Sequence, residues 1–173
     1  ETDTNYTINS LRQLELFKSK EDVSNFFHLV ASEDHVVAGE IKKLVKNGGY
    51  DYLIIDSAGK TTDKGIKELC LVSDLILITT SLNQNDLIVT YQTIEDLKPA
   101  QELNKRLKLI VVPNRINSLT SKKTIKSALE ELNVDVLEEY VPNRRSFYQA
   151  STIKTEKRYK PVAKEIIKYL KKR

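Results

Sequence analysis

An aspartate, Asp56, follows a short apolar run at residues 52–55 and precedes a turn of small residues at 57–59. The run is apolar on both faces, which predicts a strand buried within a parallel sheet. A carboxylate at the carboxyl end of such a strand lies at the edge where open α/β sheets bind ligands. It can order Mg²⁺ through water, while backbone N–H groups of the following turn approach a phosphate. The alternative is an aspartate that only caps the next element.

Apolar runs of strand length alternate with stretches of helical period along the chain. Besides 52–55, strands are predicted at 26–31, 74–79, 107–112 and, more weakly, 134–141. Helices are predicted at 5–16, from 32–34 to a stop at 47–49, at 63–71, from near Asp86 to an end or kink around Pro99, at 121–132 and at 161–172. This alternation predicts an α/β fold in which a mostly parallel sheet is flanked by helices on both faces.

The chain has 173 residues, which suits a single α/β domain over residues 1–173. No apolar run reaches the roughly 20 residues that a membrane-spanning helix needs. The single cysteine, Cys70, excludes an internal disulfide and lies in a helical pattern, so we interpret it as a buried, inert thiol. A reducing cytoplasm fits this composition.

Positive charge is concentrated at the C-terminal end. Residues 142–173 contain eleven Lys or Arg and two Asp or Glu, a net charge of +9, so the preceding residues sum to −5 within a total of +4. An acidic body with a basic end suggests a polyanionic partner such as nucleic acid. The alternative is a basic helix face that is only solvated.

Five segments occur in a recognisable order, at residues 1–5, 50–59, 71–78, 111–115 and 141–150. In that order they resemble the switch I motif, the Walker B-like strand with its switch II turn, the next strand, the strand end whose asparagine contacts adenine, and a late loop with an arginine and an aromatic residue near the base. These are features of the ParA/MinD class of deviant-Walker P-loop ATPases. The resemblance is closest to ParA-type plasmid and chromosome partition proteins, and it covers the whole chain.

The sequence also departs from that family. It contains no GxxxxGK[ST] phosphate loop, and Glu1, Thr4 and Asn5 replace the first Asp, the Pro and the Gln of switch I. The chain starts at Glu1 and contains no methionine. We therefore expect that an N-terminal βαβ unit carrying the phosphate loop is absent from this sequence, either by truncation or by loss in nature.

The resemblance implies roles for nucleotide-site residues. Asp3 would orient the attacking water and Asp56 would hold Mg²⁺ through water, although Asp3 could also be the N-cap of the first helix. The nucleotide-binding residues would be Ala58, Gly59, Asn114, Arg115 and Arg144, with Asn114 at the adenine edge or, alternatively, in an ordinary turn. DNA contacts would come from Arg145, Lys154, Lys157, Arg158, Lys160 and Lys164. Arg144 and Arg145 remain open between the nucleotide and DNA.

The implied function is that of an ATP-dependent DNA-partition ATPase with ATP and Mg²⁺ as cofactors. ATP binding would close a homodimer that binds DNA without sequence preference, and a centromere-binding partner protein would stimulate hydrolysis. The implied location is the bacterial cytoplasm, on the nucleoid and not on a membrane. Two alternatives stay open: a MinD-like membrane-surface ATPase, and a non-catalytic binding domain without a phosphate loop. Without that loop, this chain alone is expected not to hydrolyse ATP.

Overall fold

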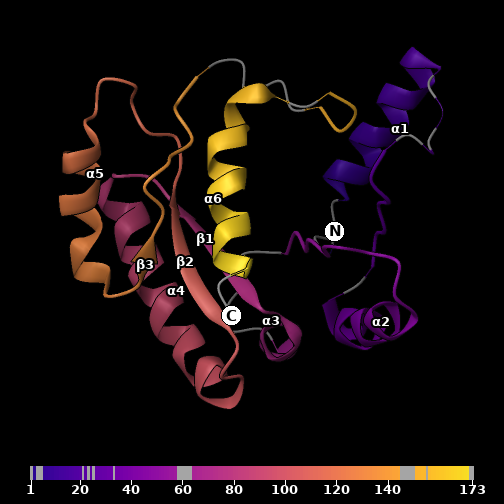
Figure 1. The fold of residues 1–173 in the computed structure, drawn as a ribbon, viewed down its shortest axis with the longest axis horizontal. Coiled ribbons are helices and arrows are strands. Elements are labelled where there is room, and N and C mark those ends of the chain that lie inside the picture. Colours follow the sequence, from indigo (N-terminus) through magenta and orange to yellow (C-terminus); the bar gives the residue numbers. More distant parts are fainter. Residues whose placement is uncertain are drawn as a thin grey trace. The chain divides into compact units, whose positions relative to one another are not determined.

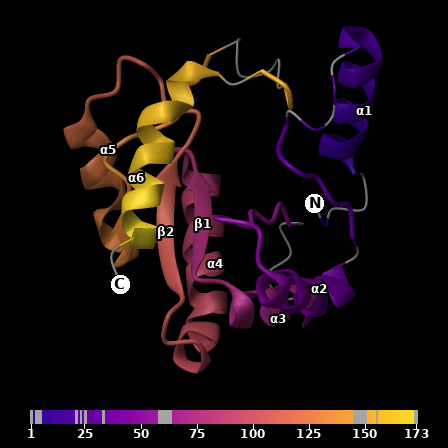
Figure 2. The same cartoon turned by 45° about the vertical axis from the view of Figure 1, so that its right-hand side comes forward.

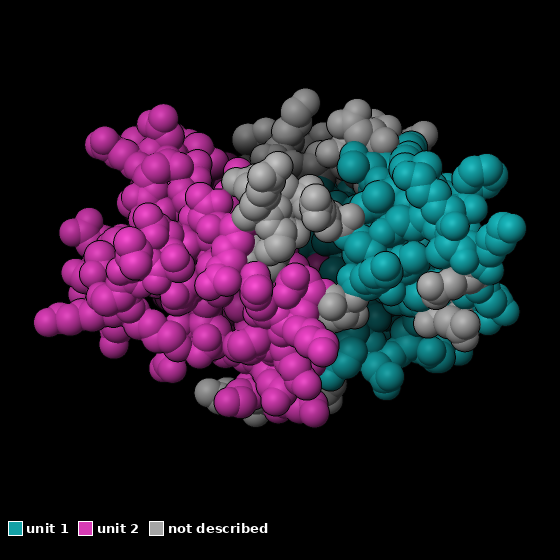
Figure 3. All heavy atoms as spheres, turned by 90° about the horizontal axis from the view of Figure 1, so that it is seen from above, with its two compact units in different colours: residues 1–72, 150–155 teal, residues 73–149, 156–173 magenta. Residues whose placement is uncertain are grey.

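The computed structural model describes residues 2, 6–20, 22, 24, 26–32, 34–57, 64–144, 151–154 and 156–171, with residues 34 and 35 described by their backbone only. The chain forms two compact units, shown in different colours in Figure 3. Unit 1 comprises residues 1–72 and 150–155, and unit 2 comprises residues 73–149 and 156–173. The single domain over residues 1–173 stays a prediction.

Unit 2 contains a parallel three-stranded sheet in the order β1-β2-β3 (Figure 1). The strands are β1 (Leu75–Thr80), β2 (Lys108–Pro113) and β3 (Asp135–Val136). β1 pairs with β2 from Leu75 opposite Lys108 to Thr80 opposite Pro113, and β3 pairs with β2 at two positions only. The predicted α/β class with a parallel sheet is confirmed.

Helices connect these strands. α4 (Gln84–Leu103) joins β1 to β2, and α5 (Lys122–Leu129), extended by a 3-10 turn at Glu130–Leu132, joins β2 to β3. A second 3-10 turn, η4 (Lys157–Tyr159), leads into α6 (Lys160–Lys171). α4 begins two residues before Asp86, because the side chain of Asn83 accepts a hydrogen bond from the N–H of Asp86 at 2.9 Å and caps the helix. It continues through Pro99, where we predicted an end or kink.

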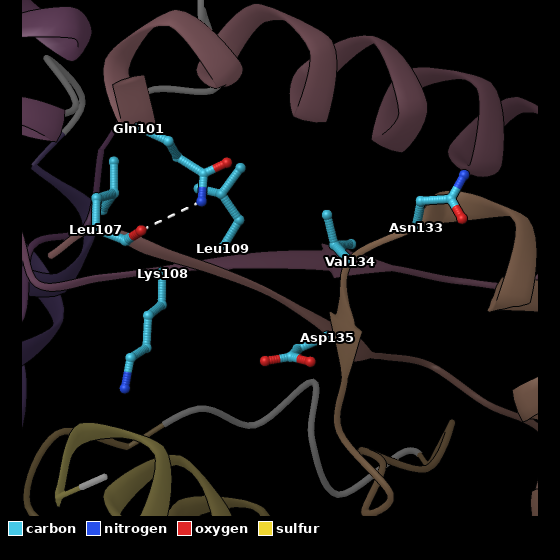
Figure 4. A pocket seen from close by; sticks show the side chains of 7 residues that line it. All are labelled: Gln101, Leu107, Lys108, Leu109, Asn133, Val134 and Asp135. Atoms are coloured by element: carbon cyan, nitrogen blue, oxygen red, sulfur yellow. Dashed lines mark hydrogen bonds between the residues drawn. The ribbon is translucent and has the colours of Figure 1, made fainter. Parts of the chain in front are cut away.

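Both faces of β2 are buried, because helices cover the sheet on both sides. Side chains alternate between the faces of a strand, and Ile110 and Val112 pack with Leu137 and with Val162 of α6. Figure 4 shows α4 on one side of β2 and α6 on the other. The core of unit 2 therefore lies around β2, and it fixes the strand ends from which the loops project.

Unit 1 contains α1 (Thr7–Ser19), α2 (Asp34–Asn47) and α3 (Lys64–Val72). α2 and α3 lie side by side (Figure 2) and bury apolar residues of both helices. α2 ends before Gly48 and Gly49, whose φ angles of 68° and 97° favour glycine. The predicted stop at 47–49 is confirmed.

Three strand predictions are wrong in whole or in part. Residues 26–31 and 52–55 are irregular, and no strand in the described part of the chain pairs with them. Ile54 is 92% exposed, so the run is not buried on both faces. An apolar run gives a strand only where a neighbouring backbone completes its hydrogen bonds. The strand predicted at 134–141 is limited to Asp135–Val136 plus an isolated bridge from Ile116 to Pro142.

Candidate functional site

The carboxyl ends of β1 and β2 meet at one edge of the unit 2 sheet. The N–H of Asn114 donates to the carbonyl of Thr80 at 2.7 Å, which holds the two strand ends together. After β1, the hydroxyl of Ser81 donates to the carboxylate of Asp86 at 2.5 Å, so the first turn of α4 is tied to this edge. Parallel α/β sheets bind their ligands at this edge.

Two loops lie side by side at this edge. The N–H of Val141 donates to the carbonyl of Pro113 at 2.9 Å, and the N–H of Ile116 donates to the carbonyl of Val141 at 3.0 Å. The N–H of Asn143 then donates to the carbonyl of Ile116 at 2.7 Å. This pairing brings three predicted nucleotide-binding residues into one loop pair: Asn114, Arg115 and Arg144.

The side chains of these residues differ in their freedom to bind a ligand. Asn114 is half-buried, and its amide oxygen accepts a hydrogen bond from the N–H of Arg115 at 2.9 Å. Arg115 has a φ of 55°, and the bond leaves the amide NH₂ of Asn114 as the group of this side chain that can donate to a ligand. The side chains of Arg115 and Arg144 are exposed. The loop pair therefore offers one neutral donor and two cations, which suits a planar base with an attached anion.

Asp56 lies in unit 1, whereas the loop pair belongs to unit 2. Its carbonyl accepts hydrogen bonds from the N–H of Thr2 at 2.8 Å and from the hydroxyl of Thr2 at 3.3 Å. Thr2 is 3% exposed, whereas Asp56 is exposed. The structure thus places Thr2 next to the backbone of Asp56. Asp3 itself lies outside the described residues, as do Ala58, Gly59 and Arg145.

The described residues fit the implied cofactors unequally. They contain no group of three or more His, Cys, Asp or Glu that could hold a metal ion. A Mg²⁺ ion bound mainly by phosphates and water needs only one or two carboxylates. Asp56 fits this mode of binding, but it does not fit a site built from several protein ligands. The phosphates of ATP fit less well, because the sequence contains no phosphate loop to surround them.

The predicted DNA contacts divide between the two units. Lys154 is exposed in unit 1. Four more are exposed on η4 and α6 of unit 2: Lys157, Arg158, Lys160 and Lys164. Lys168 and Lys171 are not among the predicted contacts, although the helical spacing continues through them and both are exposed. The result is a basic face on α6, opposite the side that packs on the sheet.

A hollow of about 530 Å³ lies elsewhere in unit 2, at the amino ends of β2 and β3. Figure 4 shows its lining, with Lys108 and Asp135 on the α6 side of the sheet and Gln101 on the α4 side. The amine of Lys108 donates to the carbonyl of Tyr169 at 3.0 Å. The hollow is open and lies at the opposite end of the strands from Asn114, so we assign it no ligand.

Unit 1 contains a buried arginine that the sequence pattern does not reveal. Arg12 is 3% exposed, and its guanidinium lies 4.4 Å from the ring centroid of Phe27. It donates to the hydroxyl of Thr152 at 2.7 Å, to the carbonyl of Thr152 at 3.1 Å and to the carbonyl of Phe27 at 3.2 Å. Glu15 accepts from the N–H and the hydroxyl of Thr152 at 2.7 and 2.6 Å. This network joins α1 to residues 150–155, and no local sequence signal reveals it.

The stability of unit 1 should depend on the ionisation of Glu15. Burial raises the pKa of Glu15, but hydrogen bonds from Ser151 and Thr152 and the charge of Arg12 together lower it. Because the pKa of Glu15 is lower in the folded state than the ordinary value of about 4.5, the ionised carboxylate stabilises the fold at pH values above that ordinary value. This stabilisation is lost as the pH falls through the folded-state pKa. We expect wild type to exceed Glu15→Gln in urea resistance near neutral pH, with the difference closing at acid pH.

The matched control is Glu102→Gln, which changes an exposed glutamate on α4. It should track wild type at every pH when unfolding is followed by circular dichroism. A pH-independent difference between wild type and Glu15→Gln would contradict the assigned role of the carboxylate.

No protein-family model matches the chain, and no curated protein matches it. Among the described residues, no helix has both the length and the apolar character that crossing a bilayer requires.

Proposed function

We propose that this chain belongs to a ParA-type DNA-partition ATPase that binds double-stranded DNA without sequence preference. ATP and Mg²⁺ are its proposed cofactors, with Asp56 near the metal and Asn114 near the base. ATP-driven homodimerisation, a centromere-binding partner and a place on the nucleoid belong to the same proposal. Its support is the order of the five sequence segments, the parallel sheet, and the loop pair that carries Asn114 and Arg144.

The basic face of α6 is the observation that carries the DNA-binding part. Lys160, Lys164 and Lys168 are exposed and follow one another at intervals of four residues, so they lie on one side of the helix. None of the three makes an ion pair with a described residue. Lysines directed at phosphates, with no group for reading bases, give binding that depends on salt and not on sequence.

The opposite face of α6 favours DNA over a membrane surface. Val162, Ile166 and Tyr169 pack against the core around β2, so these apolar side chains are engaged within unit 2. A helix that lies in a membrane interface needs a bulky apolar face to insert into the lipid.

Fluorescence anisotropy with two unrelated duplexes of about 40 base pairs tests this proposal. We expect similar affinities for both duplexes and a linear fall of log K with log salt concentration between about 50 and 200 mM. The variant Lys160→Gln/Lys164→Gln/Lys168→Gln should lower the slope by about 2 to 3, since each lost phosphate contact contributes about 0.9.

The matched control neutralises three lysines of α5: Lys122→Gln/Lys123→Gln/Lys126→Gln. These residues are exposed, and Lys122 already pairs with Glu139 at 2.6 Å. The control should keep nearly the wild-type slope. A wild-type chain without measurable affinity for either duplex would overturn the DNA-binding proposal, and equal slopes for the two triple variants would remove α6 as the contact.

This chain alone should not hydrolyse ATP, because no phosphate loop holds the β- and γ-phosphates. Phosphate release from ATP and Mg²⁺, with and without DNA, should equal the rate without protein. The control is Asp56→Asn. Turnover that is present in wild type and lost in this variant would show that the chain builds a phosphate site by another route.

A further inference from the structure

α2 of unit 1 carries a second basic face. Lys42, Lys43 and Lys46 are exposed, whereas Val37 and Ile41 are buried. At 100° per residue, the three lysines fall within one arc of about 100°, whose centre lies nearly opposite Val37 and Ile41. Buried Ala38 borders the arc next to Lys42. The buried side faces the packing with α3, so the lysines project away from that contact.

These lysines carry little compensating charge on their own helix: Glu40, three residues before Lys43, is the nearest carboxylate of α2 with a described side chain, and it accepts a hydrogen bond from Ser32. None of them forms an ion pair with a residue that the structure describes. Lys42 and Lys46 are four residues apart, and Lys43 and Lys46 are three apart, spacings at which like charges destabilise a helix. Lys46 lies in the last turn, where a cation is favourable, but Lys42 lies a full turn earlier. An anionic partner would relieve this repulsion.

Gly39 lies in the middle of the same arc. It is exposed within the helix, and a Cβ atom added there would meet nothing within 4 Å. Its φ is not in the left-handed region, so the backbone does not require glycine. A glycine inside a helix makes the helix less stable than an alanine would. No described residue packs so closely on Gly39 that a side chain would be excluded. A partner that lies close to the helix backbone would explain the glycine.

We propose that Gly39, Lys42, Lys43 and Lys46 form a second contact for the phosphate backbone of DNA, in addition to α6. Lys42 and Lys46 are separated by a rise of about 6 Å along the helix axis, and their flexible stems can follow a row of phosphates. Gly39 lets the DNA backbone approach the helix closely. This inference rests on the proposed DNA-binding function.

DNA is favoured over a membrane because this face is mainly basic, although Val36 at its margin is 43% exposed. An interfacial helix needs bulky apolar residues to enter the lipid, and the buried apolar residues of α2 lie on its α3 side instead. Uniform positive charge without groups that distinguish bases is suited to phosphates.

The test compares Lys42→Gln/Lys43→Gln/Lys46→Gln with the α5 control, Lys122→Gln/Lys123→Gln/Lys126→Gln. Both variants remove three charges at the same spacing, so any effect of net charge is equal in the two. In the same anisotropy assay over the same salt range, the α2 variant should lower the slope of log K against log salt by about 2 to 3. Circular dichroism checks that both variants keep wild-type helix content.

Gly39 gives a second test that leaves charge unchanged. Gly39→Ala should raise the melting temperature, because its Cβ enters open space and alanine favours a helix. Gly39→Gln should keep the fold and weaken DNA binding several-fold at fixed salt, since a long side chain holds the phosphates away.

The outcomes separate this inference from the proposed function. A wild-type chain that binds neither duplex contradicts both. Wild-type binding with an α2 variant that matches the α5 control contradicts the α2 contact and leaves the α6 proposal standing. Unchanged affinity in Gly39→Gln contradicts the close approach at Gly39.

Discussion

Replacing Arg12 by methionine is expected to destabilise unit 1 by about 3 kcal/mol. Methionine keeps much of the apolar stem but removes every donor. The hydroxyl and carbonyl of Thr152 and the carbonyl of Phe27 would each lose a charged partner. Glu15 would also lose the nearby positive charge that helps to keep it ionised. Leaving these part-buried acceptors unsatisfied costs more than the bonds contribute when all are formed.

Hydrogen exchange followed by mass spectrometry measures this loss locally. Amides in peptides from α1 should exchange roughly a hundredfold faster in Arg12→Met, since 1.4 kcal/mol corresponds to a factor of ten. Arg12→Lys should restore little, because an ammonium lacks the planar fork that reaches Phe27 and Thr152 together. Arg106→Met, at an exposed arginine, should leave exchange unchanged. Wild-type protection of α1 in Arg12→Met would contradict the assigned role of the network.

Truncating Ile110 to alanine should cost unit 2 between about 2 and 5 kcal/mol. Ile110 is 0% exposed at the centre of β2, where it packs with Val112, Leu137 and Val162. Removing three carbons there leaves a cavity between the sheet and α6, because strands on one side and a helix on the other cannot close over it. Peptides from β2 and α6 should lose exchange protection together.

The matched substitution is Ile88→Ala on α4. Ile88 is 51% exposed, so the same atoms are removed with little loss of packing. Its urea midpoint should stay near wild type, whereas that of Ile110→Ala should fall with an unchanged slope. Similar midpoints for the two variants would show that the cluster around Ile110 contributes little to stability.

The sequence predicts the elements of unit 2 well because each carries its own signals. β1 and β2 are apolar runs of strand length, and both are flanked by polar or turn residues. The start of α4 depends on Asn83, an N-cap signal that local sequence also contains. In a parallel sheet the loops after neighbouring strands lie at the same edge. The sequence could therefore predict that Asn114 and Arg144 lie near each other, without the details of the contact.

Unit 1 is predicted less well because its structure depends on distant partners. Residues 52–55 have the composition of a strand. Composition alone does not show whether another strand lies beside them to form hydrogen bonds. The helical period of α1 does not distinguish Arg12 from an exposed arginine. Its burial depends on contacts with Phe27 and Thr152. The roles assigned to the site residues all stay predictions, and Asp3, Ala58, Gly59 and Arg145 also lie outside the described part of the chain.

The bond between Arg12 and Thr152 also sets an order of events during protein synthesis. The two residues are 140 positions apart. At 5–20 residues per second, the ribosome delivers Thr152 roughly 7 to 30 seconds after Arg12. During that interval the strands of unit 2 up to β3 are synthesised, while α1 lacks its partner. Nascent unit 1 therefore stays open to chaperones and proteases at least until Thr152 has been made.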